Sequence, residues 1–307
     1  MNVRFRLLLA AAAIVALALG VSVTGPALAK PASEKAPKTY VALGDSFASG
    51  PLIPVQEGDP YGCLRSSNNY AHLLARATGV ILTDVTCSGG RTKHMTEPQS
   101  TSYGTNPPQF DAITAETDLV SLQIGGNDIG FSGIAQTCGR AALEGSNCRS
   151  KFQGADGGDA LRDRIADAAG DVRAAIEGIR TRTRSPEAEV FVLGYPGIFS
   201  HQEPAGCPAM LVGEGDAQYL RGIQIALNEM IEAQAIAAGA TYVDLYGPSN
   251  GKTGCDLPVI RWVEPIVVTN AAAPIHPNLT GMQGMAVVLE TAMGNSLYKG
   301  PKLATRR

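Results

Sequence analysis

A serine stands where an apolar segment ends. In the stretch YVALGDSFASG, residues 40–50, four apolar residues lead into Gly44 and Asp45, and Ser46 follows where the chain must turn. A serine in this position commonly caps a helix, because its hydroxyl can accept a backbone N–H. Its own N–H at a helix N-terminus is free to bind an anion, so the same residue could attack an ester carbonyl and help to hold the oxyanion. The two interpretations of Ser46 are compatible.

A nucleophilic serine needs a general base, and four histidines are available: His72, His94, His201 and His276. His72 lies in a helix-like stretch and is interpreted as structural, while His94 and His201 lie in polar loops. His276 stands between two prolines just before a C-terminal helix, in the stretch PIHPNLTGM. Because proline restricts the backbone, this is a rigid place from which to present an imidazole. His276 is therefore the candidate base.

Two glycine-rich clusters follow other apolar runs: CSGG at 87–90 and GGND at 125–128. Their glycines allow the backbone to approach a substrate closely. Asn127 can add a side-chain N–H to an anion held there. Its structural interpretation is a turn or cap residue, so the role of Asn127 stays open on these grounds.

Five short apolar segments predict buried strands, at residues 40–43, 80–85, 119–124, 190–193 and 242–245. Between them, apolar residues recur every three or four positions over 161–179 and 220–231, which predicts helices. Strands that alternate with helices form a parallel sheet covered on both faces. Ligands bind at the carboxyl ends of such strands, and the three polar clusters fall there.

Four motifs in this order resemble those of the SGNH hydrolases, also called GDSL-type lipases and esterases: GDSF (44–47), CSGG (87–90), GGND (125–128) and HPN (276–278). The resemblance covers essentially the whole chain after the first 29 residues, which have the pattern of a signal peptide described below. It implies a three-layer α/β/α, flavodoxin-like fold with a parallel sheet of about five strands. It implies that Ser46 is the nucleophile and His276 the base and then the acid, with an oxyanion hole made by the N–H groups of Ser46 and Gly89 and the Asn127 amide. No metal or organic cofactor is implied.

One position departs from the common family pattern. The family often has an aspartate three residues before the histidine, where this chain has Ala273. The secreted actinobacterial members, which this chain resembles, use a main-chain carbonyl that fixes the histidine tautomer without adding charge. We expect Ala273 or Pro274 to supply that carbonyl and to complete a Ser–His dyad. The alternative is a carboxylate from elsewhere in the chain, Asp128 or Glu264.

The chain has six cysteines, and an even number in an exported protein favours three disulfides. A zinc site is the rival interpretation, but no pair has CxxC spacing and no histidine lies close by. The cysteine spacing alone allows about fifteen pairings. In the secreted actinobacterial members the disulfides join sequential neighbours, so the resemblance implies the pairs Cys63–Cys87, Cys138–Cys148 and Cys207–Cys255.

The N-terminus has the pattern of a signal peptide. Arg4 and Arg6 precede an apolar run, and a small-x-small cleavage site ends at Ala29. A retained membrane anchor is the alternative. We expect secretion after cleavage near Ala29, and then three segments: a disordered leader at 30–38, one hydrolase domain at 39–300 and a tail at 301–307.

Apolar residues in two loops guide the expectation for the substrate: Pro196, Ile198, Phe199, Trp262, Pro265, Ile266, Val267 and Val268. If they line an acyl groove, the substrate is a lipid-like ester and the protein is a lipase or carboxylesterase; burial under the loops is the structural alternative. The functional alternatives are a phospholipase or carbohydrate acetyl esterase of the same fold, and a non-catalytic secreted binding protein. The net charge is −3 and no basic patch stands out, which argues against nucleic acid as a partner. We expect a monomer that binds a small or lipid ester, with transient contact to a lipid surface.

Overall fold

The computed structural model describes residues 36–155, 157–183, 187–199 and 207–294. The expected signal peptide, the C-terminal tail and His201 lie outside the described residues. Of the expected leader, residues 36–38 are described. Lys38 already contacts the domain, because its Nζ lies 3.0 Å from Glu189 Oε2 and its carbonyl accepts a hydrogen bond from the Ile81 N–H.

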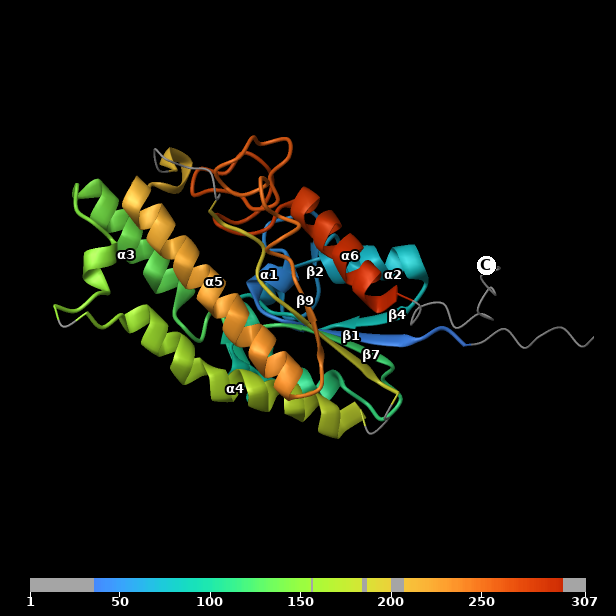
Figure 1. The fold of residues 1–307 in the computed structure, drawn as a ribbon. Helices are drawn as coiled ribbons and strands as arrows, with labels where there is room; N and C mark the ends of the chain where they lie inside the picture. Colours follow the sequence, from blue (N-terminus) through green and yellow to red (C-terminus); the bar gives the residue numbers. More distant parts are fainter. Residues whose placement is uncertain (1–35, 156, 184–186, 200–206, 295–307) are drawn as a thin grey trace, which may run out of the picture. The chain divides into compact units, whose positions relative to one another are not determined.

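A five-stranded sheet in the order β4-β1-β7-β8-β9 forms the centre of the fold, and every neighbouring pair is parallel (Figure 1). The strands are β1 (Thr39–Gly44), β4 (Ile81–Asp84), β7 (Leu119–Gln123), β8 (Glu189–Leu193) and β9 (Thr241–Val243). They match the five predicted segments to within two residues. The chain adds β4 on one side of β1 and β7 on the other, so the carboxyl end of β1 lies at the point where ligands bind in such sheets.

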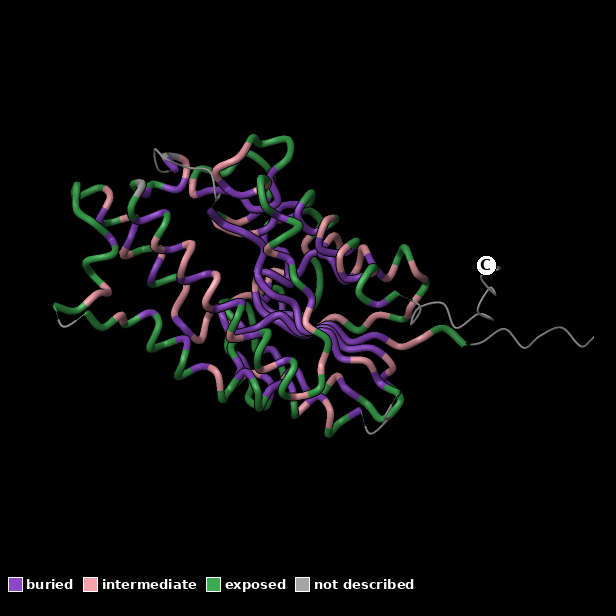
Figure 2. The backbone as a smooth tube through the Cα atoms, viewed as in Figure 1, coloured by how far each residue is buried: buried purple, intermediate pink, exposed green. Residues whose placement is uncertain are grey.

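Helices cover both faces of the sheet. The long helices α4 (Ala160–Thr183) and α5 (Glu214–Ala237) pack on one face together with α3 (Phe131–Leu143), and α2 (Tyr70–Thr78) and α6 (Leu279–Met293) pack on the other. Side chains of β1 alternate between the two cores, as the period of a strand requires: Val41 and Leu43 face α4 and α5, while Tyr40 and Ala42 face α2 and α6. Figure 2 shows the three central strands, β1, β7 and β8, buried along nearly their whole length, whereas β4 and β9 at the edges are partly exposed. The three-layer α/β/α prediction is confirmed.

The long loops contain short elements. One helical turn, α1 (Ser46–Ser49), follows β1, and two small antiparallel pairs are β2 (Gln56–Glu57) with β3 (Arg65–Ser66) and β5 (Gln99–Thr101) with β6 (Gly104–Asn106). Single 3₁₀ turns lie at Tyr61–Cys63, Thr92–Met95, Gln109–Ala112, Arg149–Lys151 and Pro208–Met210. The structure pairs the cysteines as sequential neighbours, Cys63–Cys87, Cys138–Cys148 and Cys207–Cys255. Within the described ranges, no helix is both long and apolar enough to cross a membrane.

Candidate active site

Ser46 begins a helix, but it does not cap it. The N-cap of α1 is Asp45, whose carboxylate accepts a hydrogen bond from the Phe47 N–H at 2.9 Å. The capping interpretation of Ser46 is therefore wrong, because the neighbouring Asp45 is the N-cap of α1. The Ser46 hydroxyl is left available for another partner.

That partner is His276. Its Nε2 lies 2.8 Å from Ser46 Oγ, although the two residues are 230 positions apart in the sequence. Its Nδ1 lies 2.7 Å from the carbonyl oxygen of Pro274. A carbonyl can only accept a hydrogen bond, so Nδ1 carries the proton and Nε2 is free to accept the one from Ser46. The arrangement can pass the serine proton to the imidazole.

The turn before His276 is held in an uncommon conformation. Ile275 has φ +61°, a left-handed value that is strained for a β-branched residue. Two backbone hydrogen bonds fix the turn: the Ile275 N–H donates to the Glu264 carbonyl at 3.0 Å, and the Glu264 N–H donates to the His276 carbonyl at 2.9 Å. The loop around Glu264 thus sets the direction in which the imidazole points.

Neither alternative carboxylate contacts His276. Asp128 accepts hydrogen bonds from the Thr92 N–H and hydroxyl, the latter at 2.5 Å. Glu264 accepts hydrogen bonds from the Asn278 side chain at 2.6 Å and from Thr269 and Asn270, so it holds the loop rather than the imidazole. Of the two expected carbonyls, the structure places that of Pro274 at Nδ1, whereas the Ala273 carbonyl accepts the His276 backbone N–H.

The other histidines have different partners. His72 lies on α2 with Nε2 3.5 Å from Asp84 Oδ2. His94 lies in a 3₁₀ turn, and its Nδ1 accepts the Arg91 N–H at 3.1 Å. Both positions agree with structural roles.

The predicted oxyanion donors come together at the carboxyl ends of β1, β4 and β7. The Asn127 amide donates to the Gly90 carbonyl at 2.9 Å, which joins the GGND and CSGG turns. A side chain at Gly90 would lie 3.0 Å from the Gly44 carbonyl oxygen, so only glycine lets the CSGG turn approach the turn that carries Ser46. Gly89 has φ +77°. Within the described part of the chain, the backbone N–H groups of Ser46 and Gly89 donate to no protein group.

A buried tyrosine behind Ser46 was missed by the sequence analysis. The Tyr195 hydroxyl donates to Asp45 Oδ2 at 2.5 Å and accepts the Gly126 N–H at 2.8 Å. One hydroxyl therefore joins the residue before Ser46 to the residue before Asn127. The available signal was the sequence GYPG directly after the fourth predicted strand, which places a tyrosine at the same edge of the sheet.

Burial controls the electrostatics of this centre. It lowers the pKa of His276, and the hydrogen bond to the Pro274 carbonyl opposes this only in part. The Phe47 ring, 5.0 Å from the imidazole between centroids, contributes to the apolar surroundings. Burial also raises the pKa of Asp45 to about 7, although the hydrogen bonds from Tyr195 and Phe47 oppose the rise. The imidazole is therefore neutral at neutral pH, as a general base must be.

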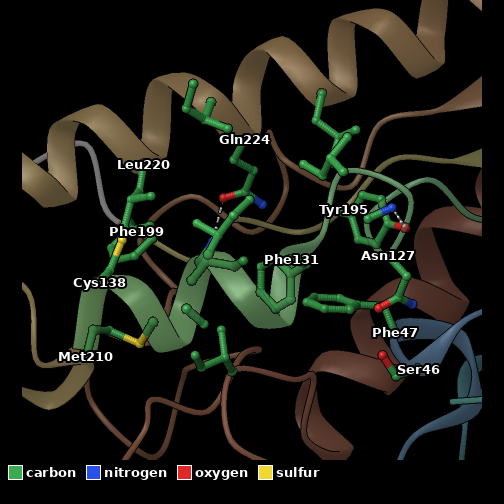
Figure 3. A pocket seen from close by; sticks show the side chains of 18 of the residues that line it. Ser46, Phe47, Asn127, Phe131, Cys138, Tyr195, Phe199, Met210, Leu220 and Gln224 are labelled. Carbon is green, nitrogen blue, oxygen red and sulfur yellow. Dashed lines mark hydrogen bonds between the residues drawn. The ribbon is translucent and has the colours of Figure 1, made fainter. Parts of the chain in front are cut away.

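An apolar pocket extends from Ser46 between α3 and α5 and encloses about 820 Å³, its open mouth included. Figure 3 shows Ser46 and Asn127 at one end and Cys138, Met210 and Leu220 at the other. The Gln224 side chain also lines the pocket, but its amide is occupied by the Ile198 N–H and the Pro196 carbonyl. The pocket thus offers apolar contacts along its length and polar groups only where Ser46 lies.

Only some of the predicted acyl-groove residues line this pocket. Ile198, Phe199 and Ile266 do. Trp262 is instead buried against Gly284 of α6, while Val267 and Val268 are exposed. Two helices supply equal parts of the remaining wall. Helix α3, which the sequence analysis did not predict, contributes Phe131, Ile134, Ala135 and Cys138, and α5 contributes Leu220, Ile223, Gln224 and Leu227. Among the described residues, no three His, Cys, Asp or Glu side chains are grouped so that they could hold a metal ion.

Comparisons with known proteins agree with this geometry. The model of the GDSL-like lipase/acylhydrolase family matches residues 42–283. Lipase 2 of Streptomyces coelicolor is 39% identical over 283 residues, which cover 90% of this chain and 92% of that protein. Among solved structures, phospholipase A1 of Streptomyces albidoflavus superposes with a TM-score of 0.70 at 27% identity, over 84% of this chain and all of that one. An extracellular lipase of Streptomyces rimosus gives a TM-score of 0.63 at 26% identity, over 83% and 99% of the two chains. With most of its length matched by one family model, the chain belongs to the GDSL-like lipase/acylhydrolase family and is an ester hydrolase.

Proposed function

We propose that the protein is a secreted serine hydrolase that cleaves lipid-like carboxylic esters through an acyl-Ser46 intermediate. One observation carries the proposal: the hydrogen-bonded pair of Ser46 and His276 lies at the end of an apolar pocket. The pair supplies a nucleophile with its base, and the pocket supplies a place for an acyl chain.

Catalysis begins when Ser46 Oγ attacks the carbonyl carbon of the ester. At the same time His276 Nε2 takes the proton of the Ser46 hydroxyl. The carbonyl oxygen becomes an oxyanion, which the N–H groups of Ser46 and Gly89 and the Asn127 amide stabilise. His276 then gives its proton to the departing alkoxide, and the acyl-enzyme remains. Water repeats the sequence and releases the acid. No group beyond these side chains and N–H donors is required.

The Pro274 carbonyl replaces the carboxylate of a triad. It holds the imidazole in the tautomer that leaves Nε2 unprotonated, and its partial charge stabilises the imidazolium that forms in each step. This is the Ser–His dyad expected from Ala273 occupying the usual aspartate position.

The pocket favours an acyl chain longer than acetyl. Its walls between α3 and α5 are apolar over the distance from Ser46 to Cys138, and burial of each methylene there stabilises the complex by about 0.8 kcal/mol. The names of the Streptomyces relatives, lipase and phospholipase A1, support a lipid substrate. The similarity to the phospholipase makes a phospholipid the second candidate, beside triglyceride.

Secretion is supported by several observations. One structural relative is an extracellular lipase, three disulfides join cysteines of the domain, and residues 1–29 have the pattern of a signal peptide. We place cleavage near Ala29 and expect the mature protein to act as a monomer.

The test is hydrolysis of a p-nitrophenyl ester series, acetyl through palmitoyl, by the oxidised mature protein and its Ser46→Ala variant. We expect activity that is highest for medium or long chains and is lost in the variant. Activity confined to acetyl would favour an acetyl esterase, and no activity at any length would favour a binding protein. Phosphatidylcholine and trioctanoin, compared next, separate phospholipase from lipase.

A second variant tests the pocket itself. Ala135 lines the pocket from α3, and Ala135→Phe should fill it, so that long-chain esters lose activity while acetyl ester hydrolysis is retained. Ala169→Phe on α4 is the matched control, because Ala169 is also partly exposed on a helix but does not line the pocket. Equal chain-length profiles in the two variants would contradict the assignment of the acyl site.

A further inference from the structure

The loop before His276 presents an apolar surface to solvent. We call this surface the apolar rim and define it as Leu257, Val259, Ile260, Val267 and Val268. All five side chains are exposed, Val259 at 82% and Val267 at 62%. Single exposed apolar residues are ordinary on a protein surface, but here five come from one loop of twelve residues, 257–268.

Hydrogen bonds hold the two halves of the rim together. The Asn270 side chain donates to the Pro258 carbonyl at 3.1 Å, which links the turn of Val259 to the turn of Val268. The Glu264 carboxylate accepts the N–H groups of Thr269 and Asn270 at 2.8 and 3.1 Å. The rim is therefore one fixed surface. Figure 1 shows the loops of residues 246–277 in orange, between α5 and α6.

The loop buries its charges and exposes its apolar groups. Between residues 257 and 268 the only charged side chains are Arg261 and Glu264, exposed by 7% and 0%, with Nη1 and Oε2 3.8 Å apart. Buried charges are costly and exposed valines gain nothing in water, so the arrangement is unfavourable for a surface that faces only solvent. It suits a surface that enters an apolar phase.

The rim is continuous with the pocket. Ile266, which directly precedes Val267, lines the pocket, as does Ile275 beside His276. A lipid in contact with the rim is thus next to the opening that leads to Ser46. We propose that the apolar rim inserts into the surface of a lipid aggregate and so presents acyl chains to the pocket; the proposal rests on the proposed lipid ester hydrolysis. Because the rim exposes no charge, it fits a neutral or zwitterionic surface, and salt should not weaken the contact.

The experiment measures partition onto vesicles of dialkyl phosphatidylcholine, whose ether-linked chains the protein cannot hydrolyse. The oxidised mature protein is compared with Val259→Asp/Val267→Asp and with Val287→Asp. Val287 is the matched control, because it is 61% exposed on α6 outside the rim. We expect the rim variant to bind at least about tenfold more weakly, and the control to bind like the wild type, at low and at high salt alike.

Activity on dissolved p-nitrophenyl butyrate separates this proposal from the proposed function. The rim variant should retain this activity to within about twofold and lose activity only on emulsified triglyceride, since the rim lies outside the reacting groups. Should the aspartate pair fail to fold, Val259→Ser/Val267→Ser takes its place. Any one of four results would overturn the rim proposal. These are failure of the wild type to bind the vesicles, binding of the rim variant as strong as that of the wild type, loss of binding at high salt, and formation of a dimer through the rim in the absence of lipid. Absence of activity on the dissolved ester in all three proteins would instead overturn the proposed function.

Discussion

At the residue scale, the main-chain carbonyl of Pro274 gives His276 an unusual electrostatic setting. A carboxylate partner would raise the pKa of the imidazole, but a neutral carbonyl raises it only weakly. Burial therefore prevails and lowers the pKa below its ordinary value of 6.5. The His276 imidazole is therefore neutral down to a lower pH than an ordinary histidine.

This setting predicts the pH profile. Only neutral His276 can accept the Ser46 proton, so kcat/KM should rise as pH increases through the pKa of His276 and then level off. The midpoint should lie below 6.5, because burial disfavours the charged imidazole. Rates on a dissolved ester from about pH 4 to 8 would check this. A midpoint clearly above 6.5 would indicate a carboxylate partner and contradict the Pro274 assignment.

Tyr195 should act as a positioning residue. Tyr195→Phe removes the hydroxyl that joins Asp45 to Gly126, so the turns of Ser46 and Asn127 lose a common tether. Because oxyanion contacts form in the transition state, we expect kcat to fall roughly tenfold while KM changes little. Tyr70→Phe is the control, since it deletes another buried tyrosine hydroxyl, bonded to Ser121 on the opposite face of the sheet. Equal kinetics in the two variants would reduce Tyr195 to a packing role.

At the element scale, the loop that carries His276 depends on one buried carboxylate. Burial raises the pKa of Glu264, but hydrogen bonds from Thr269, Asn270 and Asn278 more than offset this and hold the pKa below its usual range. A group with a lowered folded pKa contributes stability above its unfolded pKa, and that stability is lost as pH falls through the folded value. Glu264 therefore stabilises the loop at neutral pH.

Glu264→Gln should destabilise the protein by about 3 kcal/mol at neutral pH, because it leaves the buried Arg261 without its nearest carboxylate. The same variant should lower kcat, since the Glu264 loop fixes the turn of His276. Urea unfolding at pH 7 and at about pH 4 measures the effect, and the gap between variant and wild type should narrow at the lower pH. A gap that is equal at both pH values would show that ionisation of Glu264 is not the source of the stability.

The elements also show what the sequence could and could not predict. Each strand is a short apolar run ended by Gly, Asp or Cys, and α4 and α5 carry regular apolar stripes, so local pattern was sufficient for them. Helix α3 was missed because glycines interrupt it and its buried positions include the small residues Cys138 and Ala141. The pocket beside Ser46 could not be predicted, because it exists only where α3, α5 and the loop after β8 meet in space.

At the scale of the whole molecule, the order of the motifs predicted which distant residues meet. The exact geometry of their contacts depended on tertiary structure. The motif order was sufficient to expect Ser46 beside His276. The choice between the Ala273 and Pro274 carbonyls depended on the backbone conformation of Ile275. Its φ is left-handed, which no local sequence pattern favours for isoleucine. Tyr195 could not be predicted for a similar reason. Its hydroxyl connects the turns after β1 and β7, and this contact forms only in the folded structure.

The disulfides connect the loops to this framework. Cys63–Cys87 closes 24 residues and fixes the start of the CSGG turn, so Cys63→Ser/Cys87→Ser should cost about 3 kcal/mol of unfolding free energy and lower kcat. Cys138→Ser/Cys148→Ser is the control, because that bond closes only 10 residues at α3 and η4 (Arg149–Lys151). Cys138 lines the far end of the pocket from Ser46, so the comparison uses an acetyl ester, which is too short to reach it. Denaturant unfolding measures the stability of each variant, and the rate of acetyl ester hydrolysis measures its kcat. An equal loss of kcat in both would show that the first bond has no special role at the active site.

The most direct test of the account is the site of covalent reaction. The oxidised mature protein is treated with a fluorophosphonate, which phosphonylates activated serines, and the labelled peptides are identified by mass spectrometry. We predict one adduct, on Ser46, formed at least about a hundredfold more slowly in the His276→Ala variant because the base is lost. An adduct on another serine, or none on folded protein that hydrolyses esters, would contradict the assignment of Ser46 and His276 as the catalytic pair.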